Sequence, residues 1–321
     1  MAASGGTKAV VAALIANSVI AVLKFIAYFL TLSSSMLAEA IHSIADAGNQ
    51  VLLLVGGKRA ARQASPQHPF GYGRERYIYA FIVSIVLFSV GGLFALYEAY
   101  QKWQDPHPIE GGFWWVPLAV LVGAIVAETF SFRTAIIESN HVRGKQSWVQ
   151  FVKTAKSPEL PVILLEDLGA LLGLVFALFG VSMTLITGDG FWDALGTAMI
   201  GVLLVTIAVI LALETKSLLL GESATKDDVA KIEAALSEGD PARIIHLKTL
   251  HLGPEELLVA AKISVADGET GEQIAEEINN AENRIREAVP IATVIYLEPD
   301  LHSNDPRGTS SPTAHSSSDA H

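Results

Sequence analysis

The chain has 321 residues, of which 51% are hydrophobic and only 17% are charged, and its mean hydropathy is +0.41. So low a charged fraction is unusual in a soluble globular protein and indicates a membrane protein. The formal net charge of −11 argues against nucleic-acid binding, which needs a basic surface. Because the chain has no cysteine, disulfides, thiolate metal sites and iron–sulfur clusters are excluded, and any bound metal must have nitrogen and oxygen ligands.

Six apolar segments are long enough to cross a bilayer, which takes about 20 residues as a helix. They are residues 9–32, 36–57, 77–100, 113–137, 160–186 and 191–213. Lys and Arg gather in the loops after the second and fourth segments, and because basic loops stay on the cytosolic side, both termini are expected in the cytosol. The first residues, MAASGGTK, show neither a secretory signal nor a transit peptide, which together with the short loops favours a prokaryotic plasma membrane.

Much of the acidic charge lies beyond Gly221, in a part of the chain that reads as a small soluble domain with the element order αββαβ. Thr225 with Asp228, and Thr270 with Gln273, match the pattern that begins a helix. Strands are predicted at residues 244–252, 257–265 and 292–297, which gives a three-stranded sheet with two helices on one face.

The chain is therefore predicted to be an α-helical membrane protein with a C-terminal α+β domain. The predicted parts are a six-helix membrane domain at residues 1–220, a cytosolic domain at 221–301 and a disordered tail at 302–321, which is rich in Ser, Thr, Pro, Asp and His.

The second apolar segment carries polar residues that are costly inside a bilayer, and each is therefore a functional candidate. They are Glu39, His42, Asp46 and Asn49. His42 and Asp46 are four residues apart, so an imidazole and a carboxylate lie on one helical face at neighbouring turns. This spacing suits a pair of metal ligands.

The fifth segment carries Glu166 and Asp167 with no basic residue in the same segment. Two adjacent carboxylates at low dielectric should share a proton or bind a cation. A divalent cation held between the two segments, with His42 and Asp46, would satisfy both sets of residues. An isolated intramembrane His or acid is more often an interhelical contact, and Glu128 in the fourth segment fits a proton relay and a water-facing packing acid equally well.

Several motifs occur in order along the chain: MLAEAIHSIADAGNQ, HPFGYGRERY, ILLEDLGALLG and FWDALGTAMIG. Together they resemble the cation diffusion facilitator family, and within it the subgroup that contains zinc transporter nine. The resemblance implies a homodimer with six transmembrane helices per protomer and a ferredoxin-like, metallochaperone-like cytosolic domain. It also implies exchange of a divalent transition metal for protons by alternating access, with no prosthetic group; the partners would be metal ions, protons and the lipid bilayer.

The family's transport site uses a pair four residues apart in the second span, matched by His42 and Asp46. Its fifth-span partner is usually a His four residues before an Asp that matches Asp167, but Ile163 stands at that position. Glu166 lies about 60° around the helix from Ile163, so it can face the same site. Replacing a nitrogen ligand by an oxygen ligand makes the donor set of the site chemically harder, so manganese and iron(II) become candidates beside zinc. Cobalt, nickel and cadmium are further possible metals.

The accessory sites of the family match less well. In the loop after the second span, His68 matches the first of two histidines, while Tyr72 replaces the second, so His68 is interpreted as ordering the loop. His246 is the one counterpart of a binuclear cytosolic cluster, and we expect the domain to dimerise without that cluster. Asn49, beside the predicted ligands, and Glu128 are further accessory candidates.

Three other functions remain open at this point. A membrane metal sensor or partner-docking protein would bind metal at the same residues without transport. A channel would pass metal without saturation or proton coupling. An intramembrane metallohydrolase is disfavoured because the HExxH motif is absent. Export of zinc from the cytosol is the favoured prediction.

Overall fold

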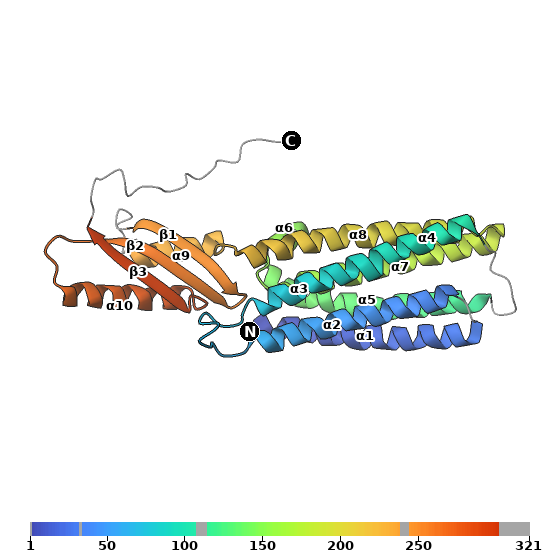
Figure 1. Ribbon diagram of the computed structural model, residues 1–321, viewed down its shortest axis with the longest axis horizontal. Helices are drawn as coiled ribbons and strands as arrows, with labels where there is room; N and C mark the ends of the chain where they lie inside the picture. The colour runs from blue at the N-terminus through green and yellow to red at the C-terminus, as the bar shows by residue number, and fades with distance from the viewer. Residues whose placement is uncertain (1, 32–33, 107–113, 238–243, 302–321) are drawn as a thin grey trace, which may run out of the picture. The chain divides into compact units, whose positions relative to one another are not determined.

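A computed structural model of the chain describes residues 2–31, 34–106, 114–237 and 244–301 (Figure 1). The chain divides into two compact units, Met1–Leu220 and Gly221–His321. The predicted disordered tail, with its three histidines, lies outside the described residues. The side chain of Glu39 also lies outside them.

The first unit is a bundle of long helices that run side by side (Figure 1). Its elements are α1 (Ala2–Thr31), α2 (Ser34–Ala60), α3 (Glu75–Val86), the π-helical η1 (Leu87–Leu93), α4 (Phe94–Gln104), α5 (Trp115–Arg143), α6 (Trp148–Thr154), α7 (Glu159–Thr187) and α8 (Phe191–Leu220). The elements α3, η1 and α4 follow one another without a break and form one long helical segment.

Within the described residues, five helical segments are long and apolar enough to cross a membrane. They are Ala9–Ile26, Glu75–Gln104, Trp115–Arg143, Glu159–Thr187 and Phe191–Leu220. They confirm five of the six predicted spans, and the chain is a multi-pass helical membrane protein. The predicted second span, α2, is not among the five because its polar residues lower its hydropathy. The count of six is therefore not confirmed by this criterion.

Glycines let α7 and α8 approach closely. A Cβ atom on Gly180 would lie 2.8 Å from the carbonyl oxygen of Trp192, and one on Gly196 would lie 2.8 Å from that of Phe176. Small residues commonly permit such contacts between membrane helices, where packing rather than hydrophobicity drives association. This contact fixes α8 against the helix that carries Glu166 and Asp167.

The second unit has the predicted order αββαβ. Its elements are α9 (Lys226–Ser237), β1 (Ile244–Gly253), β2 (Glu256–Val265), α10 (Gly271–Ala288) and β3 (Val294–Leu301). Thr270 and Gln273 form the predicted capping box at the start of α10, and the amide of Asp228 donates to the hydroxyl of Thr225 at the start of α9.

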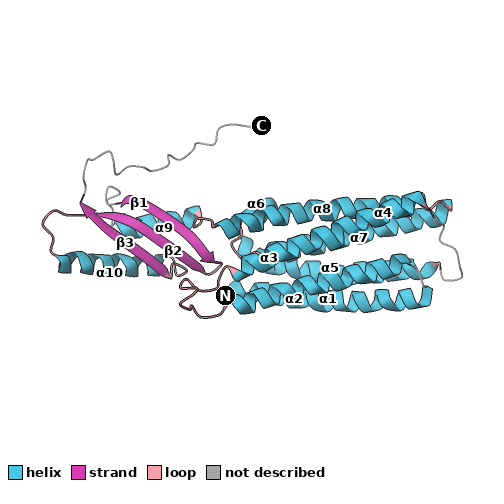
Figure 2. Ribbon diagram, viewed as in Figure 1, coloured by secondary structure: helices cyan, strands magenta, loops and turns pink. Residues whose placement is uncertain are grey.

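The three strands form a sheet in the order β1-β2-β3, shown in magenta in Figure 2. β2 is antiparallel to β1 and parallel to β3, which follows it through α10. Alternate β2 residues, such as Val259 and Ile263, are buried and join one core with Ile232 of α9 and Ile285 of α10. Both helices therefore cover the same face of the sheet, as predicted from the alternating pattern.

Candidate functional site

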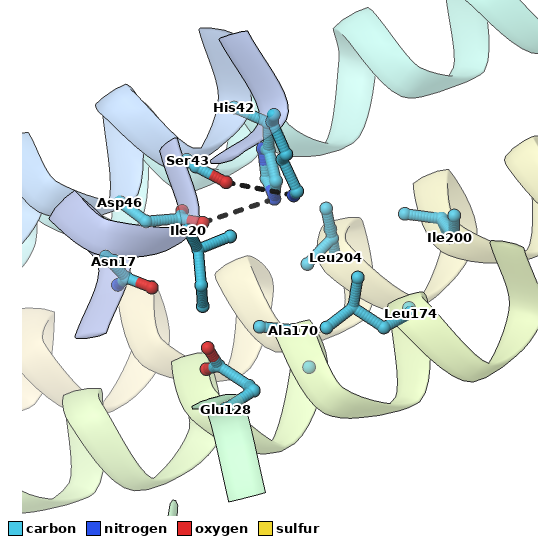
Figure 3. A pocket seen from close by; sticks show the side chains of 13 residues that line it. Asn17, Ile20, His42, Ser43, Asp46, Glu128, Ala170, Leu174, Ile200 and Leu204 are labelled. Atoms are coloured by element: carbon cyan, nitrogen blue, oxygen red, sulfur yellow. Dashed lines mark hydrogen bonds and ion pairs between the residues drawn. The ribbon is translucent and has the colours of Figure 1, made fainter. Parts of the chain in front are cut away.

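His42 and Asp46 come together on α2 as the spacing predicts. The Nε2 atom of His42 lies 3.5 Å from the Oδ2 atom of Asp46. Both residues line a cavity of about 30 Å³ (Figure 3). Four further polar side chains line it, Asn17 and Lys24 from α1, Ser43 from α2 and Glu128 from α5, together with Ile20 of α1 and small and apolar residues of α7 and α8. An imidazole–carboxylate pair therefore borders a small polar space inside the helix bundle.

The two carboxylates of α7 are buried, with 3% of Glu166 and 1% of Asp167 exposed. Glu166 accepts hydrogen bonds from Asn49 Nδ2 at 2.9 Å and from Gln50 Nε2 at 3.0 Å, both from α2. Asp167 Oδ2 accepts a hydrogen bond from Ser131 Oγ on α5 at 2.8 Å. Neutral amide donors thus hold both oxygens of Glu166, whereas the Oδ1 atom of Asp167 has no hydrogen-bond partner among the described residues.

The four predicted ligands do not form a ready-made metal cluster. In the part of the chain that the structure describes, no three His, Asp or Glu side chains gather closely enough to hold one metal ion. His42 and Asp46 form a pair, whereas Glu166 is held by Asn49 and Gln50. The predicted set of His42, Asp46, Glu166 and Asp167 therefore stays a prediction, and Asn49 is the accessory candidate that contacts one of its members.

Several polar residues of this region were not singled out from the sequence. Gln50 donates to Glu166 and accepts a hydrogen bond from Asn17 Nδ2 at 3.3 Å, so it joins α1 to α7. A sequence signal for Gln50 existed, because it continues the four-residue spacing of His42 and Asp46 along α2. Ser131 had a weaker signal, since it lies one turn after Glu128 on α5.

Two charged side chains are buried beside the His42–Asp46 pair. Lys24 is 4% exposed, and its Nζ atom donates to Ser43 Oγ at 2.9 Å. It therefore points into the bundle instead of extending to the membrane surface. Glu128 is 1% exposed and lines the same cavity, which excludes a water-facing position for it in this conformation.

A second cavity, of about 260 Å³, lies near the end of α2 that carries the basic residues. Leu53 and Leu160 line it on the inside, and Lys58 lines it beside the ion pair between Arg76 Nε and Glu159 Oε1, which are 3.3 Å apart. Leu53 lies one helical turn from Gln50 on α2. The cavity therefore lies at the basic end of the bundle, about one helical turn along α2 from the residue that donates to Glu166.

His68 takes part in an ordered loop. Its backbone N–H and carbonyl pair with those of Ser65, and its ring lies 4.6 Å from that of Tyr72, measured between centroids. The hydroxyl groups of Ser65 and Tyr72 are 3.1 Å apart. These contacts agree with the interpretation that His68 orders the loop.

His246 is exposed on β1 and lies opposite Lys262 in the register of β1 and β2. The ammonium of Lys262 forms ion pairs with Asp300 at 2.7 Å and Glu298 at 3.3 Å. Hydrogen bonding to Asp300 and then Glu298 raises the pKa of Lys262, and the hydrogen bond from Lys262 lowers the pKa of Asp300. Among the described histidines of this unit, His251 is the buried one, and its Nδ1 lies 3.3 Å from the carbonyl oxygen of Gly253.

The fold and the site define a multi-pass helical membrane protein with buried carboxylates in its interior and a partly buried histidine beside them, followed in the chain by a small three-stranded α+β unit. Such an interior is typical of proteins that move cations. Residues 10–220 match the family model for the cation efflux transmembrane domain, and the chain belongs to this cation efflux family. The predicted family and subgroup are thereby confirmed.

Curated relatives agree with this assignment. The chain is 31% identical over 297 residues to the human "Proton-coupled zinc antiporter SLC30A9, mitochondrial", covering 92% of this chain and 52% of that protein. It is 34% identical over 264 residues to the Xenopus laevis protein of the same description, covering 81% and 46%. Zinc transporter ZitB of Pectobacterium atrosepticum is 32% identical over 130 residues, covering 40% of this chain and 39% of that protein. The chain spans about half the length of the SLC30A9 relatives it matches.

Proposed function

We propose that this protein carries a divalent transition metal, zinc first, out of the cytosol in exchange for protons. The observation that carries the proposal is the His42–Asp46 pair at 3.5 Å beside a polar cavity inside a helix bundle whose facing helix bears Glu166 and Asp167. The relatives described as proton-coupled zinc antiporters support the same cargo and coupling. The chain's function is thus transport rather than catalysis.

The four proposed ligands are His42, Asp46, Glu166 and Asp167. Amide and hydroxyl donors now hold three of the four oxygen atoms of the α7 carboxylates, and we expect metal binding to weaken or replace these hydrogen bonds as α2 and α7 shift relative to each other. Protons compete for the same groups, since His must be neutral and carboxylates ionised to bind a metal. This competition couples the two fluxes without a separate proton site.

The donor set comprises one imidazole nitrogen and three carboxylates. Zinc accepts such ligands, but oxygen-rich sites also suit manganese and iron(II). Ile163, which is fully buried, supplies no ligand at the position where the family usually has a histidine. The metal preference of this site is therefore expected to be broader than that of a site with two histidines.

We include α2 as a sixth span. Its buried face carries Asp46, Asn49 and Gln50, whereas Ile41 and Ile44 are 42% and 52% exposed on its outer side. A helix with a polar inner face and an apolar outer face suits a position between protein and lipid. With six spans, both termini are expected on the side of the basic loops, which we propose to be the cytosol.

The second unit is proposed to be a metallochaperone-like domain that joins two protomers into a homodimer. Its order of strands and helices supports a ferredoxin-like topology. The matched relatives come from a mitochondrial and a bacterial setting, so the prokaryotic plasma membrane stays a prediction.

The proposal is tested by proton flux in sealed proteoliposomes on addition of zinc, manganese, iron(II), cobalt, nickel or cadmium. We expect a saturable flux that the double variant Asp46→Ala, Asp167→Ala abolishes. Glu138→Gln, on α5 but outside the proposed site, is the matched control and should transport normally. Metal binding without any flux would replace the proposal by a metal sensor, and flux without saturation or proton movement would indicate a channel.

A further inference from the structure

The polar residues of α2 extend along its inner face over about two helical turns, with Asp46 between His42 and Asn49. Asn49 and Gln50 donate to Glu166, whereas His42 borders the 30 Å³ cavity. His42 and Asn49 are seven residues apart, which is about 10 Å along a helix. The predicted ligands are thus divided between two levels of the bundle, with Glu166 at one and His42 at the other.

Glu128 of α5 belongs to the level of His42. Figure 3 shows its carboxylate directed into the cavity from the side opposite His42 and Asp46. The side chain is 1% exposed, and among the described residues its Oε1 atom has no hydrogen-bond partner. A buried carboxylate oxygen without a donor is costly, and it marks a place where a further group binds.

The surroundings of this oxygen fit a cation. The cavity has room for little more than one water-sized particle, which suits an ion that has lost most of its hydration shell. Gly169 and Gly173 of α7 line its wall without side chains. An imidazole and two carboxylates border the space, and these are ligands that zinc and manganese both accept.

From this geometry we infer that His42, Asp46 and Glu128 form a second cation position, distinct from the level of Glu166, through which the metal passes. The inference rests on the proposed function, because it takes the transported metal as the occupant. In the conformation described, the three side chains lie around the cavity without meeting at one point, so binding requires them to close inward by rotamer changes or a small helix shift.

Lys24 supplies a fixed positive charge beside His42 and Glu128. Its ammonium lines the cavity and donates to Ser43 at 2.9 Å. A fixed positive charge near Asp46 and Glu128 compensates these acids when no metal is bound, and it repels an arriving divalent ion. Lys24 therefore lowers the metal affinity of this position, and removing its charge should strengthen binding.

The test measures zinc and cobalt binding to the detergent-purified full chain, with zinc affinity from competition against a chromophoric chelator. For Glu128→Gln we expect about tenfold weaker zinc binding or the loss of one bound ion, by comparison with the effect of removing groups around metal sites. The visible absorption of bound cobalt, which reports its ligands, should change as well. Lys24→Gln should bind zinc more tightly than the unaltered chain.

Glu138→Gln is the matched control on the same helix and should bind both metals normally. Glu128→Asp keeps the charge on a shorter side chain and should restore part of the zinc affinity, which separates loss of a ligand from misfolding. The size-exclusion elution profile of each variant gives a second check for misfolding. Unchanged zinc affinity, stoichiometry and cobalt absorption in Glu128→Gln would overturn the inference. Because flux of the unaltered chain is measured separately, that result would leave the proposed transport intact, whereas absence of flux would overturn the transport function itself.

Discussion

Gln50 of α2 donates a hydrogen bond from its Nε2 atom to Oε2 of Glu166 on α7, at 3.0 Å, although 116 residues separate them in the chain. The carbonyl oxygen of the same Gln50 side chain accepts a hydrogen bond from Asn17 of α1. One fully buried amide therefore links three helices at the carboxylate that we propose as a metal ligand. Metal binding at Glu166 must compete with this link.

Replacing Gln50 by Leu tests that competition. The change leaves Glu166 with the hydrogen bond from Asn49, so the metal-free protein should lose about 1–3 kcal/mol of stability. The stabilisation produced by zinc should increase, because the ion has one hydrogen bond fewer to replace. Thermal melting in detergent with and without zinc measures both. Ser18→Ala, which removes an exposed hydroxyl bonded within α1, is the control, and equal zinc stabilisation in both variants would contradict the competition.

Ser131→Ala should leave Asp167 without the hydrogen bond to its Oδ2 atom. Since Asp167 is 1% exposed, we expect a loss of about 1–3 kcal/mol in the metal-free state. Ser131→Thr keeps the hydroxyl and should recover most of that loss. Melting temperatures of the two variants check this, and equal destabilisation by both would show that packing, not the hydrogen bond, matters at this position.

The ion pair between Arg76 and Glu159 should couple α3 to α7 beside the 260 Å³ cavity. Their side chains are 16% and 12% exposed, so solvent screens the pair only in part. A double-mutant cycle with Arg76→Gln and Glu159→Gln should give a coupling energy of about 0.5–3 kcal/mol. Additive effects of the two substitutions on thermal stability would show that the pair contributes nothing to the bundle.

Gly196→Ala should separate α7 from α8. The new Cβ would lie 2.8 Å from the carbonyl oxygen of Phe176, a backbone atom that cannot move aside cheaply. We expect a destabilisation of about 1–3 kcal/mol, as for other overpacked sites. Gly123→Ala on α5 is the control, because nothing lies within 4 Å of its added Cβ, and it should be neutral or stabilising. A similar melting temperature for both variants would contradict the close approach.

The pair between Lys262 and Asp300 should make the stability of the sheet depend on pH. The pKa of Asp300 is lowered in the fold, so its contribution is present above its unfolded pKa of about 3.9 and is lost as pH falls through the lower folded value. The pKa of Lys262 is raised, so its contribution is present below about pH 10.4 and is lost as pH rises through the higher folded value. Between these limits, Asp300→Asn should reduce the hydrogen-exchange protection of β2 and β3 amides.

The control for this pair is Asp267→Asn, in the exposed turn after β2. It should leave the protection of the β2 and β3 amides unchanged at every pH. The difference between Asp300→Asn and the unaltered chain should vanish at acid pH, where Asp300 is protonated in the folded state as well. A difference that persists there would assign the effect to packing rather than charge.

Local signals in the sequence were enough to predict most elements. The capping box of Thr270 and Gln273 and the alternation along β2 depend on residues near one another in the chain, and both are present in the structure. The pair of His42 and Asp46 was predictable for the same reason, since helix geometry alone brings residues four apart together. The hydropathy signal of α2 was weaker, because the polar residues that include the proposed ligands His42 and Asp46 lower its hydropathy.

The sequence by itself determined the five apolar spans, the order of the small α+β unit and the family, since hydropathy, periodicity and ordered motifs all lie along the chain. The tertiary structure alone decided which groups hold the buried carboxylates: Asn49 and Gln50 for Glu166, and Ser131 for Asp167. It also decided that Lys24 and Glu128 share a cavity with His42. The physical reason is that a buried polar group forms its hydrogen bonds with whichever helix packs beside it. Local periodicity in the sequence does not predict which helices, distant in the chain, pack together.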